Sequence, residues 1–162
     1  MTDSFSPEDE FWDFAVRTYG IAGVGERLLD WQDGRGANVN LVLLCLWAAE
    51  RGRRLDPAAC ARAFAAASGW HTAAVEPLRA LRRRLKVEWA GLAQDVRPTR
   101  SAVLAAELKA ERAEQGLMLA ALAPWPAEAG ANPGQALARI NLLAYLGSAA
   151  EADIDALLAA IG

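Results

Sequence analysis

Five basic residues lie within the short segment Pro77–Lys86, and their side chains are the best suited in this chain to bind a charged partner. Four of them fall on one stripe of a helix: Arg79, Arg82, Arg83 and Lys86. Such a stripe can bind phosphates, an RNA backbone or an acidic protein. It can instead be solvated, or paired with three acids that share a face of the following helix: Glu107, Glu111 and Glu114. The sequence leaves both arrangements open.

A second group of polar residues could line a pocket for a small molecule. Asp13 and Arg17 are four positions apart, so they can point into one cleft or simply pair with each other. Asn40 and its neighbour Asn38 begin a segment that is apolar nearly all round, which is typical of a buried helix. Capping and a structural hydrogen-bond network explain both asparagines, and ligand contact by Asn40 is the alternative.

The usual catalytic and metal-binding patterns are missing from the sequence. His71 is the only histidine, and nothing near it specifies a nucleophile, so a structural role explains it. Cys45 and Cys60 are far from it, so no zinc-ligand spacing exists, and two buried, reduced thiols are expected. Asp30 and Asp33 alone are too weak a pair to indicate magnesium. We therefore expect no catalytic residue, cofactor or metal, and a binding protein rather than an enzyme.

The six tryptophans divide into two expected groups. Three lie on apolar stripes and are predicted to be in the core: Trp12, Trp47 and Trp89. The other three lie at helix ends or beside prolines, where partly exposed tryptophan is typical of an interface: Trp31, Trp70 and Trp125. Trp70 precedes the basic segment, which makes it the aromatic candidate for a joint binding surface.

Caps and breakers predict an all-α fold, a single domain over residues 1–162 built as an orthogonal bundle of about eight helices. The expected helices span about 7–19, 24–33, 38–51, 56–68, 72–94, 99–123, 135–146 and 148–161. Proline at 98 separates the two longest, which should form an antiparallel hairpin because their connection is short. Ser148 and Glu151 form a capping box, and the segment from Pro124 to Gly134 is expected to be a loop.

Composition and charge indicate the cellular compartment and the classes of partner that suit this chain. The net charge is −3, which gives the whole protein no field that attracts nucleic acid. The acidic N-terminal sequence lacks the basic and apolar regions of a signal peptide. The longest apolar run, from Val39 to Ala49, is shorter than the roughly 20 residues that span a bilayer. These features favour the cytoplasm and no membrane partner.

Three motifs resemble a family of small, uncharacterised α-helical proteobacterial proteins. They are a W-x-F pair (Trp12 and Phe14), a V-N-L-x-L segment after Asn38, and a P-L-R-x-x-R-x-x-L-K type stretch ending at Lys86. The resemblance covers about the first two thirds of the chain, so residues 1–123 form the family-like part and residues 124–162 a C-terminal helical pair. The family's acidic residue before V-N-L is Asn38 here. The resemblance implies a helical fold and no established activity.

The sequence thus favours a non-enzymatic module that binds a protein partner, or a second copy of itself, through Trp70 and the basic stripe of Arg79, Arg82, Arg83 and Lys86. One alternative is a small-molecule-binding protein or enzyme with a polar helical pocket formed by Asp13, Arg17 and Asn40, with Arg79. Another is nucleic-acid binding through the basic stripe.

Overall fold

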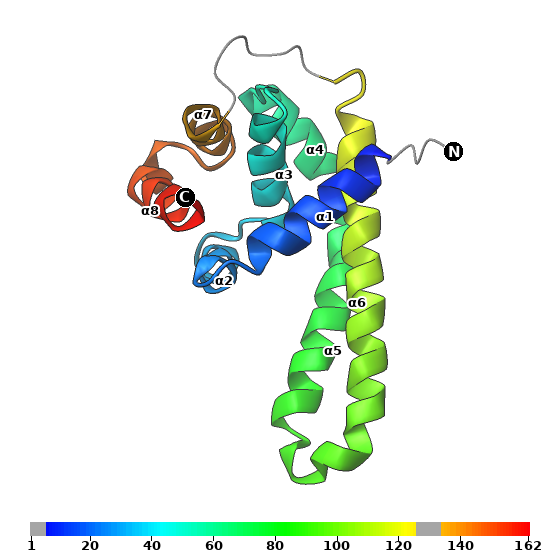
Figure 1. Ribbon diagram of the computed structural model, residues 1–162. Coiled ribbons are helices and arrows are strands. Elements are labelled where there is room, and N and C mark those ends of the chain that lie inside the picture. Colours follow the sequence, from blue (N-terminus) through cyan, green and yellow to red (C-terminus); the bar gives the residue numbers. More distant parts are fainter. Residues whose placement is uncertain (1–5, 126–133) are drawn as a thin grey trace, which may run out of the picture.

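Helices make up nearly all of the chain in a computed structural model that describes residues 6–125 and 134–162 (Figure 1). The α-helices are α1 (Pro7–Tyr19), α2 (Val24–Arg35), α3 (Val39–Glu50), α4 (Pro57–Trp70), α5 (Glu76–Val87), α6 (Ala93–Ala121), α7 (Gln135–Leu146) and α8 (Glu151–Ile161). No strand occurs in these two ranges, so the predicted all-α class is confirmed. The loop expected from Pro124 to Gly134 lies mostly outside the described residues.

Side-chain caps begin three of these helices where the sequence indicated them. The hydroxyl of Ser6 accepts from the Asp9 amide at 3.2 Å, and the Asp56 carboxylate accepts from the Ala59 amide at 2.7 Å. The Asn38 side chain accepts from the Leu41 amide at 3.1 Å. The predicted capping box at Ser148 is wrong: residues Ser148–Ala150 form a 3₁₀ turn, and α8 begins at Glu151 without a side-chain cap.

Helix α3 is the centre of the core. All of its residues from Asn40 to Ala49 are buried, as expected for a helix that is apolar all round. It packs against α1, α2, α4, α6 and α7. One hydrophobic cluster joins α3 to residues of α7 and α8, including Leu142 and Ile154, both fully buried. The C-terminal helices therefore complete the same core as the first four.

Helices α4 and α5 were expected to be separate, but they run on as one continuous helix. A π-helical turn, His71–Val75, joins them, and the Glu76 amide donates to the His71 carbonyl. Proline 77 follows directly. A proline in a regular α-helix clashes with the carbonyl four residues earlier, and the wider π turn provides the room that the ring needs. The eight α segments thus make seven continuous helices among the described residues.

The turn of the long hairpin lies earlier than the sequence predicted. Helix α5 ends at Val87, a 3₁₀ turn spans Ala90–Leu92, and α6 begins at Ala93, so Pro98 lies inside α6 instead of before it. Pro98 removes the amide that would bond to the Gln94 carbonyl. Both residues are exposed, so water can hydrate that carbonyl, and the helix continues.

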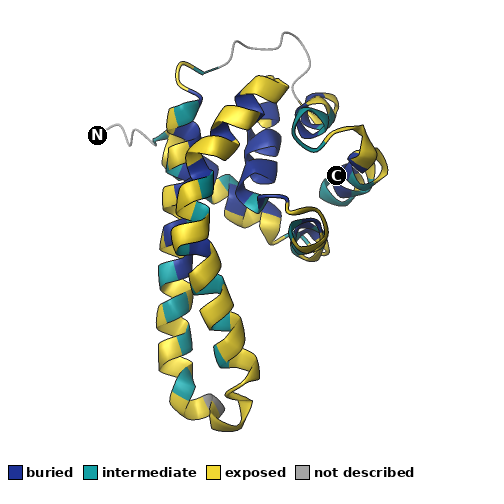
Figure 2. Cartoon of the chain, turned by 180° about the vertical axis from the view of Figure 1, so that it is seen from behind, coloured by how far each residue is buried: buried dark blue, intermediate teal, exposed yellow. Residues whose placement is uncertain are grey.

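The antiparallel hairpin of α5 and α6 is confirmed, and its distal part projects from the bundle (Figure 1). We call residues 79–104 the arm. Figure 2 shows that burial is concentrated in the bundle and that the arm is almost entirely exposed or half-buried. Helix α5 contains no buried residue. Over most of its length, each helix of the arm therefore packs only against the other helix of the hairpin.

Among the residues that the structure describes, no helix combines the length and the apolar character needed to cross a bilayer.

Candidate functional site

The basic stripe of α5 is partly neutralised by α6. Arg79 donates from Nη2 to Glu111 Oε1 at 2.7 Å and from Nε to Glu107 Oε1 at 3.3 Å, and it also bonds the Gln32 side chain. Arg82 donates to both carboxylate oxygens of Glu107, at 3.1 Å for Nη2. The side chain of Arg79 is only 12% exposed. These two cations hold the base of the hairpin together.

The electrostatics of this cluster follow from burial and from the two arginines. Burial acts to raise the pKa of Glu107, but hydrogen bonds from Arg82 and Arg79 outweigh it and lower that pKa. For Glu111 burial dominates, and its pKa is raised despite Arg79. Partly buried, charge-assisted pairs of this kind are stronger than exposed ones.

The other residues of the predicted stripe stay at the surface. Arg83 and Lys86 are exposed and form no ion pair within the described part of the chain. Trp70 is 40% exposed, and its indole N–H donates to the Ala110 carbonyl at 2.8 Å, which fixes α4 to α6. The predicted surface is thus divided between a structural part (Arg79 and Arg82) and an exposed part.

The tryptophans correct three expectations. Trp47 is in the core, but Trp89 is 49% exposed at the turn of the arm, because α5 ends before it. Trp31, expected at an interface, is buried against the bundle. Trp12, also expected in the core, is instead half-buried at the surface, with the Arg112 guanidinium 5.7 Å above its ring. Trp125 packs edge-on against Trp47.

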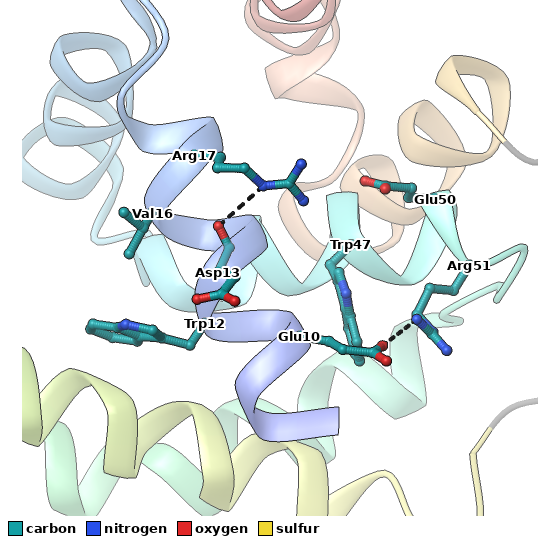
Figure 3. A pocket seen from close by; sticks show the side chains of 8 residues that line it. All are labelled: Glu10, Trp12, Asp13, Val16, Arg17, Trp47, Glu50 and Arg51. Carbon is teal, nitrogen blue, oxygen red and sulfur yellow. Dashed lines mark hydrogen bonds and ion pairs between the residues drawn. The ribbon is translucent and has the colours of Figure 1, made fainter. Parts of the chain in front are cut away.

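The predicted polar pocket is only partly assembled. Asp13 and Arg17 line an open hollow of about 560 Å³ between α1 and α3 (Figure 3). Arg17 bonds the backbone carbonyl of Asp13 at 3.4 Å instead of its carboxylate, and Arg51 pairs with Glu10 across the hollow. Asn40 does not line this hollow, because it points into the core, and Arg79 lies at the base of the hairpin.

A buried carboxylate organises the polar residues of the core. Glu114 of α6 is 0% exposed. Asn38 donates to its Oε1 at 2.8 Å and Asn40 to its Oε2 at 2.6 Å. The Gln115 side chain donates to Asn40 Oδ1 at 2.9 Å. The backbone N–H of Asn38 donates to the Tyr145 hydroxyl at 2.8 Å. Glu114 thereby joins α3 to α6, and Asn38 extends the network to α7, which matches the structural network expected for the asparagines.

His71 is the titratable partner of Glu114 in this network and pairs with it as a cation when the ring is protonated. Its Nδ1 lies 2.7 Å from Glu114 Oε1, and the hydrogen bond from Glu114 raises the pKa of His71 above its ordinary value, although burial opposes the shift. The ring is held by the π turn that begins at His71, and turns of this kind are frequent at functional sites. A histidine oriented by a carboxylate can hold or move a proton at its other nitrogen.

The sequence did not reveal that His71 and Glu114 meet. They are 43 positions apart, and Glu114 is 76 from Asn38, so helix periodicity links none of them. The available signal was that Asn38 and Asn40 required buried partners. Glu114 was assigned to the acidic stripe with Glu107 and Glu111, but it lies closer to the bundle, where a histidine and two amides meet it.

We expect the raised pKa of His71 to make stability depend on pH. The folded protein holds this proton more tightly than the unfolded chain, so the stabilisation is complete below the unfolded pKa of about 6.5 and is lost as pH rises through the folded value. Urea unfolding of the wild type and of His71→Gln between mildly acidic and alkaline pH measures this. The wild-type advantage should shrink as pH rises; an advantage that grows with pH contradicts the assignment.

The two cysteines are buried free thiols that contact each other. Their mutual hydrogen bond and burial raise the pKa of Cys45, while the same bond lowers the pKa of Cys60. Within the described ranges, no group of three or more His, Cys, Asp or Glu side chains could hold a metal ion.

Comparison with known proteins gives a family without an assigned activity. The comparisons with curated proteins and with solved structures found no match. The sequence model of a family described as "Protein of unknown function (DUF2390)" matches residues 10–118. This range includes most of α1, all of α2–α5, the arm and all residues of the Glu114 network except Tyr145 of α7. The match covers more than half of the chain, and the protein therefore belongs to this uncharacterised family.

Proposed function

We propose that this protein is a non-enzymatic interaction module that binds an acidic protein partner through its arm. The observation that carries the proposal is the combination of exposed apolar and basic side chains on a hairpin that projects from the bundle. The exposed part of the predicted stripe, Arg83 and Lys86, lies on this arm. We propose that the protein acts in the cytoplasm of a proteobacterium, because two buried free thiols suit a reducing compartment.

The apolar side chains of the arm favour a protein partner. Five of them are at least 40% exposed: Leu81, Val87, Trp89, Leu92 and Leu104. Val87 reaches 74%. Aromatic and aliphatic side chains that are exposed in the free protein gain most from burial at a protein interface, where tryptophan and arginine are enriched. Binding of phosphates alone would leave these side chains in water.

Charge indicates the chemistry of the partner. Within the arm, Arg79 and Arg82 are already paired with Glu107 and Glu111 of α6. The remaining residues 83–104 contain five Lys and Arg against two Asp and Glu, a net charge of +3, while the rest of the chain contains twelve against eighteen, a net charge of −6. An acidic surface is therefore attracted to the arm, and the remainder of the molecule repels long polyanions such as nucleic acids. A second copy could also offer its acidic bundle to the arm, so self-association is one outcome of the test.

The test compares two charge-reversed variants with the same net charge. Arg83→Glu/Lys86→Glu alters the arm, and Arg54→Glu/Arg62→Glu alters exposed residues of the bundle. Each tagged protein is used for affinity purification from its native host with quantitative mass spectrometry, and sedimentation measures self-association. We expect one stoichiometric acidic protein that both the wild type and the bundle variant retain and the arm variant loses. The purified partner should then bind with an affinity that falls by about tenfold or more in the arm variant.

Three results would contradict this proposal. The arm variant could retain the same partners as the bundle variant. The arm could mediate only self-association, which would make the second copy its occupant. Finally, a single-stranded RNA or DNA could bind with an affinity that falls steeply with salt and is lost in the arm variant, which would identify nucleic acid as the ligand.

A further inference from the structure

A small cavity is lined by His71, and Glu114 is not among the residues that line it. It has a volume of about 210 Å³ and is formed by the end of α2, α4 and the π turn. The residues important here are Asn38, Phe64, Ser68, His71, Thr72 and Glu76. The volume is below the range of roughly 300–1,000 Å³ for drug-sized ligands, so an occupant would be small.

Glu114 determines which nitrogen of His71 can act in this cavity. A carboxylate only accepts, so the close contact of 2.7 Å places a proton on Nδ1. In the neutral ring, Nε2 is then an acceptor. It lies 3.8 Å from Glu76 Oε1, which is too far for a direct hydrogen bond. The cavity thus presents two acceptors side by side, and a nitrogen with two N–H groups could lie about 2.8 Å from each.

The charges around the cavity favour a cation. Glu114 and Glu76 carry two negative charges, and His71 carries at most one positive charge. The other charged group acting on His71 is Arg79, which is bound to Glu107, Glu111 and Gln32. A bound anion would therefore face a net negative surface in either protonation state of the histidine.

The apolar side of the cavity accommodates the rest of such a ligand. Phe64 is 42% exposed and lines both this cavity and an adjoining hollow of about 510 Å³ along α4 and α7. An aromatic ring beside an ammonium group adds cation–π attraction and apolar contact. We propose that this cavity binds a small primary amine in its ammonium form, with its N–H groups donated to His71 Nε2 and Glu76 and its apolar group against Phe64.

Binding should depend on pH through the groups that face His71. These groups are Glu114 of α6, and Glu76 and Arg79 of α5. Protonated His71 has a donor at Nε2 and cannot accept from the ammonium. Affinity should therefore rise as the histidine loses its proton, and fall again where the amine itself deprotonates, at a pH near about 10.

The single histidine gives a direct measurement, because the protein has only one imidazole Cε1–H signal in a proton–carbon correlation spectrum. The probes are phenethylammonium, its quaternary trimethyl derivative and phenylacetate, added to the full chain at alkaline pH where His71 is neutral. We expect a saturable shift of the His71 signal with phenethylammonium at millimolar concentrations or below, and none with phenylacetate. The quaternary compound, which has no N–H, should bind at least about tenfold more weakly.

Glu76→Gln tests the second contact, and Glu26→Gln, an exposed residue on α2, is the matched control. Glu76→Gln should lower the affinity for phenethylammonium by about tenfold or more, and Glu26→Gln should leave this affinity unchanged. No saturable shift, equal shifts from phenylacetate, or equal affinity of both variants would overturn the proposal. Because these signals come from His71 in the absence of any partner, they are independent of what the arm binds.

Discussion

Glu114→Ala should unfold this protein at a much lower temperature than the wild type. The substitution removes the acceptor of three hydrogen bonds and leaves His71 and the amides of Asn38 and Asn40 without their buried partner. Breaking a buried charged pair typically costs about 3–5 kcal/mol. For a chain of 162 residues this corresponds to a decrease in Tm of roughly 10 °C, measured by calorimetry or circular dichroism.

Two further variants distinguish this network from a general effect of changing α6. Lys109→Ala replaces an exposed residue of the same helix and should shift Tm by far less. The double variant His71→Ala/Glu114→Ala should lose clearly less stability than the two single variants together, since both remove one shared interaction. Additive losses would mean that His71 and Glu114 do not stabilise each other.

Asn141→Leu should destabilise the whole molecule, although Asn141 lies outside the range matched by the family. This residue of α7 is 0% exposed. Its Oδ1 accepts from the Leu55 amide at 2.8 Å, and its Nδ2 donates to the carbonyls of Cys45 and Arg53 at 3.1 and 3.0 Å. Leucine has a similar size but leaves the buried Leu55 amide without this acceptor. We expect a loss of about 2–4 kcal/mol.

The shape of the unfolding curve shows whether α7 and α8 unfold together with the other helices or separately. Because Asn141 and Leu142 belong to the same core as α3, Asn141→Leu should lower one common transition. Ile140→Ala, which truncates a neighbour that is 42% exposed, is the control and should have a smaller effect. An early transition confined to the variant, with the main one unchanged, would show that α7 and α8 unfold as a separate unit.

Local chemistry made much of the fold predictable. Ser6, Asn38 and Asp56 each supply a cap that depends only on the next three residues. Gly36, with φ of 65°, ends α2 because its left-handed conformation suits glycine. The predicted helix boundaries were wrong where the surrounding structure accommodates a proline inside a helix. The π turn accommodates Pro77, and the carbonyl that Pro98 leaves without a hydrogen bond is exposed to water.

The candidate site was predictable only in part, and for a physical reason. Pairing of Arg79 and Arg82 with acids of the next helix follows from a hairpin and two charged stripes, which the spacing of the residues provides. The contact between His71 and Glu114 needs the relative position of two helices and of the π turn, which no local pattern specifies. Trp89 was assigned to the core because its apolar stripe was followed past the true end of α5.

The absence of any buried residue in α5 has a consequence for how this protein can change over evolutionary time. Substitutions at its exposed positions disturb no core packing, so most should alter stability by no more than about 0.5 kcal/mol. Buried positions of α3 have no such freedom. Mutational drift can therefore change the surface of the hairpin while the bundle stays folded.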